Sequence, residues 1–175
     1  MFTDPKENLN NFGLEPKMTV ADLGCGTGAY SLAVAQMVGP EGRVLAVDVQ
    51  KDLLTRVKND ADKAGLSNVE ILWGDIEELN GTGIRDHACD AVIVSNILFQ
   101  TEDKNTFLKE AHRILKPHGK LLLIEWLDSF GGMGPMASAV INPEKAKELL
   151  SSNGFTFEKQ FDAGSHHYGI VAKAS

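Results

Sequence analysis

Short apolar segments with strand character alternate with helix-like segments along most of this chain. Strand-like runs cover residues 18–22, 43–48, 69–73, 91–95, 120–126, 155–161 and 167–173, and helical spacing marks 29–38, 51–64, 104–115 and 143–152. Strands that alternate with helices build parallel β-α-β units with helices on both faces of the sheet. The pattern therefore predicts a doubly wound, Rossmann-like α/β fold with a seven-stranded, mostly parallel sheet.

The last two strand-like runs predict a hairpin around residues 162–165, which would add one antiparallel strand to the sheet. A length of 175 residues favours a single domain that spans residues 1–175. Two segments stand outside the alternation: an N-terminal segment, 1–17, and a stretch rich in glycine and methionine, 127–141. Methionine adapts to irregular apolar surfaces, so 127–141 is interpreted as a lid or as an ordinary connection after the fifth strand.

Charge and composition exclude several classes of protein. Twenty-four acidic and 17 basic residues give a net charge of −7, which argues against non-specific binding to nucleic acid. No apolar run approaches the roughly 18 residues that span a membrane, and no basic, apolar leader opens the sequence. Cys25 and Cys89 form no CxxC motif, and the histidines form no metal-ligand pattern. We expect a cytoplasmic protein without a metal, either a monomer or a homodimer.

The segment with the strongest functional signal is 20–28, VADLGCGTG, between the first strand-like run and the first helix. Gly24, Gly26 and Gly28 allow positive φ angles and close approach of a ligand to the backbone. Glycines 24 and 26 with Ala29 also loosely fit the dinucleotide fingerprint, so the glycines alone do not choose the cofactor. Asp22 favours a different ligand, because a buried carboxylate gains from a cationic amino-acid group and gains nothing beside a pyrophosphate.

Further motifs follow at the ends of the next strand-like runs: Asp48-Val49, Gly74-Asp75-Ile76, and the segment 90–96, DAVIVSN. With 20–28, these motifs resemble, in order and over residues 18–173, the class I S-adenosylmethionine-dependent methyltransferases. The resemblance implies that Asp48 binds the ribose hydroxyls, Val49 contacts the adenine, Asp75 accepts from the adenine amino group and Ile76 packs on the ring.

The resemblance implies S-adenosylmethionine as cofactor and S-adenosylhomocysteine as product. The cofactor-binding residues expected from it are Asp22, Gly24, Cys25, Gly26, Gly28, Tyr30, Asp48, Val49, Asp75, Ile76, Ser95 and Asn96.

The acceptor is less well defined by the sequence. Residues 95–98, SNIL, lack the Asn-Pro-Pro-aromatic segment of enzymes that methylate exocyclic amines of nucleic-acid bases, and two cysteines argue against an arsenite methyltransferase. Spacing and short loops are most similar to the small-molecule group that includes quinone-biosynthesis enzymes. An RNA or protein methyltransferase, a non-catalytic cofactor-binding module and an NAD-dependent oxidoreductase remain as alternatives.

A catalytic base is needed only if the acceptor carries a proton of high pKa. The candidates at the expected cleft edge are Glu125, Asp128, His166 and His167. A parallel sixth strand would bring the 162–168 turn to the carboxyl edge of the sheet, where open α/β sheets bind ligands. We expect this turn to face the methyl-transfer site from the side opposite 127–141.

Overall fold

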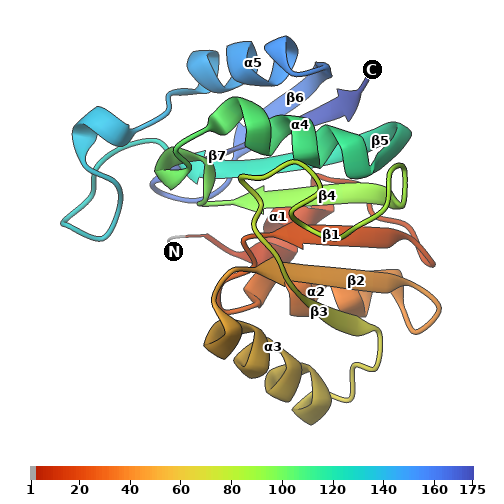
Figure 1. Cartoon of the computed structure of the whole chain (residues 1–175). Coiled ribbons are helices and arrows are strands. Elements are labelled where there is room, and N and C mark those ends of the chain that lie inside the picture. The colour runs from red at the N-terminus through yellow and green to blue at the C-terminus, as the bar shows by residue number, and fades with distance from the viewer. Residues whose placement is uncertain (1–2) are drawn as a thin grey trace.

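The computed structural model describes residues 3–175 and contains one seven-stranded sheet with the order β3-β2-β1-β4-β5-β7-β6 (Figure 1). The strands are β1 (Thr19–Leu23), β2 (Arg43–Asp48), β3 (Val69–Trp73), β4 (Cys89–Ser95), β5 (Leu115–Trp126), β6 (Phe155–Asp162) and β7 (His167–Ala174). The pairs from β3 to β5 are parallel, and β7 runs antiparallel to both of its neighbours. The predicted fold class is confirmed.

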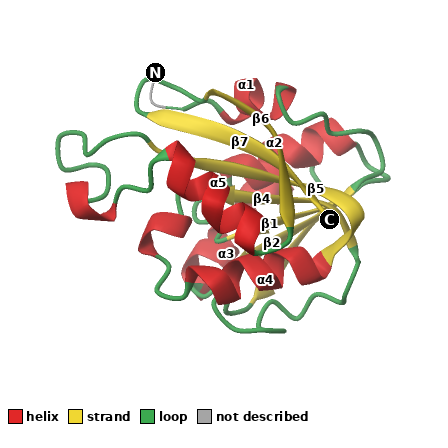
Figure 2. Cartoon of the chain, turned by 90° about the horizontal axis from the view of Figure 1, so that it is seen from above, coloured by secondary structure: helices red, strands yellow, loops and turns green. Residues whose placement is uncertain are grey.

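Helices cover both faces of this sheet. They are α1 (Pro5–Asn10), α2 (Ala29–Val38), α3 (Lys51–Lys63), α4 (Lys104–Ile114) and α5 (Pro143–Ser152), with short 3-10 turns η1 (Leu98–Gln100) and η2 (Ala137–Ala139). One apolar cluster packs α4 and α5 on the sheet, and a second packs α1, α2 and α3 on it. In Figure 2 the strands lie between α1 and α2 on one side and α4 and α5 on the other.

Local side-chain chemistry explains where several helices begin. The Asn142 side chain accepts a hydrogen bond from the Lys145 N–H at 2.9 Å, and Pro143 occupies the first turn of α5. The same arrangement opens α1, where the Asp4 side chain caps the helix and Pro5 starts it. The buried central strands are continuous apolar runs because both of their faces are covered.

The starts of β4 and β5 differ most from the sequence prediction, several other ends differ by one residue, and one helix was missed. β5 begins at Leu115 rather than at residue 120, because Leu115 pairs with Cys89 before a register shift in the ladder. β4 correspondingly begins at Cys89. Helix α1 lies within the N-terminal segment, where no helix was predicted; at six residues it is too short to show helical periodicity.

The carboxyl ends of β1 to β5 meet at one edge of the sheet, together with the turn that joins β6 to β7. The hairpin reaches this edge because His167 at the start of β7 pairs with Trp126 at the end of β5. The 127–141 segment projects from the same edge, at the left of Figure 1. In residues 3–175 no helix has the length and apolar character to cross a bilayer.

Candidate active site

A cavity of about 590 Å³ opens at the carboxyl ends of β1, β2, β3 and β4. Its volume lies within the range usual for small-molecule sites. The expected cofactor residues that line it are Asp22, Gly24, Cys25, Gly26, Tyr30, Asp48, Val49, Asp75, Ile76, Ser95 and Asn96. The structure thus brings all the expected residues except Gly28 to one cavity.

The glycine loop is tied by its backbone to the end of the neighbouring strand. The N–H groups of Gly24 and Cys25 donate to the Val47 carbonyl at 2.9 and 3.0 Å. Gly28 has a φ of +82° and caps α2, and a Cβ there would lie 2.6 Å from Cγ2 of Val57 on α3. Because Gly28 has no side chain, the loop can pack closely on α3. This packing explains why a glycine is needed at position 28, although Gly28 does not line the cavity.

Asp22 is a buried carboxyl group at the cavity, 2% exposed, near the end of β1. The Ser31 hydroxyl donates to its Oδ2 atom at 2.6 Å. Burial raises the Asp22 pKa to about 6, although the hydrogen bonds from Ser31 oppose that shift and the nearby Asp48 adds to it. A cationic ligand group beside Asp22 would stabilise its ionised form.

Asp48 ends β2 and is 7% exposed. Its Oδ1 atom accepts from the Gln50 N–H at 2.9 Å, and its Oδ2 atom accepts from the Gly26 N–H at 3.0 Å. These bonds fix the orientation of the carboxylate, and each oxygen retains a lone pair for a ligand hydroxyl. Asp75, beyond β3, is oriented in a similar way by the Glu77 N–H at 2.9 Å.

The N-terminal segment forms part of the cavity wall through Thr3 and Pro5, which the sequence analysis did not include among the site residues. The Asn8 side-chain N–H group donates to Thr3 Oγ1 at 2.7 Å and to the Tyr30 hydroxyl at 2.8 Å, so α1 is fixed to α2. The Asp4-Pro5 pair is a helix-start signal that could have located this wall.

The end of β4 and the turn after it also line the cavity. Asn96 has a φ of +54°, and its Oδ1 atom is buried with no hydrogen-bond partner among the described residues. Further lining residues that the sequence analysis missed are Thr27, Ala29, Gln50, Leu53, Glu77, Ile97, Gln100 and Thr101. Gln50 and Ile97 lie two residues after the ends of β2 and β4, a position that could have located them.

The candidate bases do not line the cavity. Glu125 is fully buried, and burial raises its pKa to about 7 against the hydrogen bonds that it accepts from backbone N–H groups. His167 is 1% exposed, and its ring lies 4.2 Å from that of Trp126. His166 pairs through Nδ1 with the Asp128 carboxylate at 2.9 Å.

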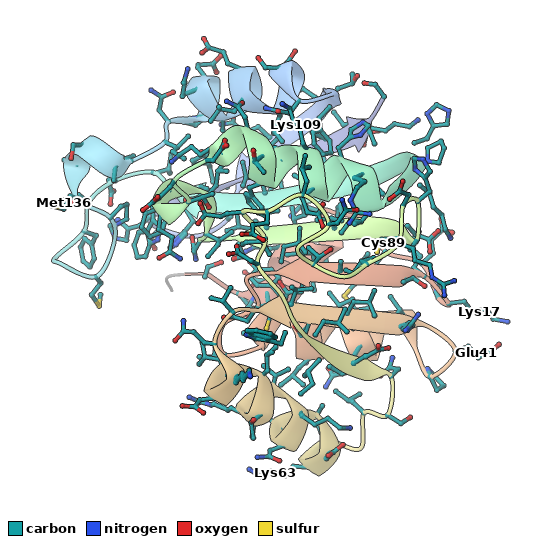
Figure 3. All side chains as sticks on the ribbon, viewed as in Figure 1. Lys17, Glu41, Lys63, Cys89, Lys109 and Met136 are labelled. Carbon is teal, nitrogen blue, oxygen red and sulfur yellow. The ribbon has the colours of Figure 1, made fainter. Side chains whose placement is uncertain are left out.

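The hairpin turn and the 127–141 segment pack against each other, so the expectation that they face each other across the site was wrong. The Leu127 N–H donates to the His166 carbonyl at 2.8 Å, which continues the β5–β7 ladder beyond the strands. The Phe130 ring stacks on the His166 ring at 4.0 Å. Met136 lies at the outer end of this segment, 77% exposed (Figure 3).

In residues 3–175 no group of three or more His, Cys, Asp or Glu side chains is arranged to hold a metal ion. Cys25 and Cys89 are both buried, and burial raises the pKa of both thiols, that of Cys89 to about 12. Cys25 lines the cavity. Cys89 lies on the side of the molecule opposite Met136 (Figure 3).

Comparisons with known proteins agree with this geometry. Residues 14–154 match the model of a methyltransferase domain family. A demethylmenaquinone methyltransferase of Bacillus cytotoxicus is 32% identical over 120 residues, which are 69% of this chain and 49% of the relative. An arsenite methyltransferase of Aquipseudomonas alcaligenes is 35% identical over 106 residues, 58% of this chain and 31% of the relative. The chain thus spans about half the length, or less, of these curated relatives.

Among solved structures, a SAM-dependent methyltransferase from Aquifex aeolicus superposes with a TM-score of 0.90 at 28% identity, over 99% of this chain and 91% of that one. The sheet order, the glycine loop and the strand-end carboxylates therefore occur in a chain that matches a methyltransferase both in sequence and in structure. This chain belongs to the methyltransferase domain family and has the fold of its class I, S-adenosylmethionine-dependent members.

Proposed function

We propose that this chain binds S-adenosylmethionine in the cavity and transfers its methyl group to a small, uncharged acceptor. The observation that carries the proposal is the meeting of Asp22, Asp48 and Asp75, from the ends of three neighbouring strands, around one cavity beside the glycine loop. Each carboxylate matches a different hydrogen-bond donor of the cofactor: the ammonium group, the ribose hydroxyls and the adenine amino group.

The residues present fit this cofactor in further respects. Gly26 lines the cavity, and a Cβ there would meet no atom within 4 Å, so the loop leaves open space for a ligand. The buried Asn96 Oδ1 atom, which has no partner among the described residues, can accept from the ammonium group. The first N–H groups of α2 have no helical partner and can bind the cofactor carboxylate.

When bound, S-adenosylmethionine supplies a methyl group on a positively charged sulfur, which is already electrophilic. The main task of the chain is then to orient both reactants, and orientation can provide about 7–11 kcal/mol of the barrier. Asp22 and Asp75 would hold the two ends of the cofactor, Asp48 would hold its ribose, and Ser95 and Asn96 line the same cavity. His166, held by Asp128, is the candidate base for an acceptor that must lose a proton.

The charge of the cavity argues against an anionic acceptor. Its lining includes four carboxylates, Asp22, Asp48, Asp75 and Glu77, and none of its described lining residues is Lys, Arg or His. An acceptor with phosphate or carboxylate groups would be repelled, and a nucleic acid would lack basic contacts. Exposed apolar side chains at the same edge, among them Leu127, Phe130 and Met133, suit an apolar acceptor such as the one named in demethylmenaquinone methyltransferase.

Arsenite is a weaker candidate, despite the similarity to an arsenite methyltransferase. Arsenic binding needs several thiolates close together, whereas Cys25 lies at the cavity, Cys89 lies at the start of β4, and the pKa values of both thiols are raised.

Calorimetry with S-adenosylhomocysteine, with NAD as the comparison ligand, tests the cofactor. We expect micromolar affinity for S-adenosylhomocysteine, about −8 kcal/mol, and none for NAD. Absence of binding at millimolar S-adenosylhomocysteine would refute the proposal.

Transfer of radiolabelled methyl to fractionated small molecules, RNA and protein from a lysate tests the acceptor. Label in the neutral small-molecule fraction supports the proposed class, and label only in RNA or protein contradicts it. Cofactor binding with no label in any fraction would favour a non-catalytic binding module.

A further inference from the structure

We propose that Glu125 is a positioning residue: its buried carboxylate holds the turn after β4 against the glycine loop and so shapes the cofactor cavity without touching it. The inference rests on the proposed function, because it concerns the wall of the same cavity. It assigns Glu125 a role different from the base that the sequence analysis considered.

Among the described residues, the hydrogen bonds that the Glu125 side chain accepts come from backbone N–H groups, and the charge of Lys104 acts to lower its pKa. Its Oε1 atom accepts from the Leu98 N–H at 2.8 Å and from the Phe99 N–H at 3.3 Å. Its Oε2 atom accepts from its own neighbour, the Trp126 N–H, at 3.4 Å. The carboxylate is fully buried and is absent from the cavity lining, so a ligand in the cavity would not contact it.

The turn that Glu125 holds begins where β4 ends. Asn96 takes a left-handed φ of +54°, which turns the chain away from the strand, and its N–H donates to the Ile124 carbonyl at 2.8 Å. The residues from Leu98 to Gln100 then form the 3-10 turn η1. The last two residues before Trp126 in β5 therefore bind three successive points of this segment: Asn96, Leu98 and Phe99.

The same segment forms one wall of the cavity, through Asn96, Ile97, Gln100 and Thr101. The side chain of Ile97 also lies against the glycine loop, since a Cβ on Gly24 would come within 2.8 Å of its Cγ1 atom. Displacement of the turn would consequently change both the wall and the support of the loop.

A carboxylate suits this position for a physical reason. The N–H groups at the start of a helical turn have no partner within the turn. The Leu98 N–H is buried and that of Phe99 is partly buried, so an unsatisfied donor is costly, and one carboxylate oxygen can accept from both. An apolar side chain of similar size would leave both donors unsatisfied, whereas a glutamine carbonyl oxygen could still accept from them.

Asp90, near the start of the neighbouring strand β4 and away from the turn that follows it, provides a control. Its Oδ2 atom accepts from the Thr19 N–H at 2.9 Å, and its Oδ1 atom pairs with Lys116 at 2.6 Å. Like Glu125, it links a strand to a backbone N–H, but it lies outside the cavity lining.

The test compares Glu125→Leu, Glu125→Gln and Asp90→Leu by calorimetry with S-adenosylhomocysteine and by hydrogen exchange of residues 96–101. We expect Glu125→Leu to weaken binding at least tenfold and to speed exchange in 96–101. Glu125→Gln should remain within threefold of the parent in affinity. Asp90→Leu should lower the melting temperature while affinity and exchange in 96–101 stay unchanged.

The inference is overturned if Glu125→Leu keeps the parent affinity and exchange, or if Asp90→Leu weakens binding as much as Glu125→Leu does. If Glu125→Leu does not fold, Glu125→Asp, whose shorter side chain cannot reach both N–H groups, replaces it with the same expectations. Failure of the parent chain to bind S-adenosylhomocysteine would refute the proposed function instead. The exchange comparison would still decide whether Glu125 holds the turn.

Discussion

The Oδ2 atom of Asp48 accepts a hydrogen bond from the backbone N–H of Gly26 at 3.0 Å, so the last residue of β2 holds the middle of the glycine loop. Because the Gly24 and Cys25 N–H groups also donate to Val47, two consecutive residues of β2 determine where this loop lies. Asp48 thus has a structural contact and a proposed ligand contact on the same carboxylate.

Asp48→Ala should weaken S-adenosylhomocysteine binding by about 1.5–3 kcal/mol, because charge-assisted hydrogen bonds to the ribose hydroxyls are lost. That loss corresponds to a dissociation constant roughly 10- to 150-fold higher and is measured by calorimetry. Circular dichroism should show that the fold is retained. If the variant binds as tightly as the parent chain, Asp48 holds the glycine loop and does not contact the ligand.

Cofactor affinity should depend on pH through Asp22. With its pKa raised to about 6, Asp22 is mostly protonated at pH 5 in the free chain, and a protonated carboxyl attracts an ammonium group far less. The affinity for S-adenosylhomocysteine should rise about tenfold between pH 5 and pH 7. Calorimetry across this range measures it, and Asp22→Asn should remove the dependence.

The raised pKa of Asp22 also predicts how the free energy of unfolding changes with pH. The folded chain holds the Asp22 proton more tightly than the unfolded chain does, since the pKa is raised from 3.8 to about 6. The contribution of this group to the free energy of unfolding is therefore fully present below pH 4 and is lost as the pH rises to 6. Urea unfolding should show that the parent loses stability relative to Asp22→Asn as the pH rises from 4 to 6.

Gly26 and Gly28 should differ in what an added methyl group disturbs. Both have positive φ, so either alanine variant carries about 1–2 kcal/mol of backbone strain. Gly28→Ala also places its Cβ 2.6 Å from Val57, which adds about 1–3 kcal/mol of overpacking. Urea unfolding should show the larger loss of stability in Gly28→Ala.

Gly26→Ala should instead show the larger loss of affinity relative to its loss of stability, because Gly26 lines the cavity and Gly28 does not. Calorimetry with S-adenosylhomocysteine on the two folded variants measures this. Equal affinity in Gly26→Ala and the parent would place the ligand elsewhere in the cavity.

His166→Ala should lower turnover while S-adenosylhomocysteine affinity stays within threefold, since His166 does not line the cofactor cavity. His167 is left intact because it is buried against Trp126. A base would lower kcat by about 10²–10⁴ and change the pH profile, whereas a positioning residue would mainly raise KM. Steady-state kinetics with the acceptor found by the label screen distinguish these outcomes, and unaltered kinetics would exclude both roles.

The strands were predictable because buried parallel strands are continuous apolar runs, and β2 and β3 match their predicted bounds. β5 was predicted too short because its first residues, which include Pro117 and Gly119, do not resemble a strand. Helix α1 is too short to show helical periodicity in the sequence. Asp4 and Pro5 are its helix-start signal.

The cavity was largely predictable because parallel strands bring their carboxyl ends together, so Asp22, Asp48 and Asp75 had to meet. The role of Glu125 was not predictable. It depends on the distance between the end of β5 and a turn that follows β4, and no local pattern encodes that distance. The packing of His166 on Phe130 was missed for the same reason.

The position of β7 has a consequence for the order in which the sheet can form during synthesis. β7 follows β6 along the chain, yet it lies between β5 and β6 in the sheet. When β6 leaves the ribosome, its only neighbour in the sheet has not yet been made, and its backbone groups cannot pair. β6 and β7 therefore join the sheet together in one late step, after β1 to β5 have had time to fold.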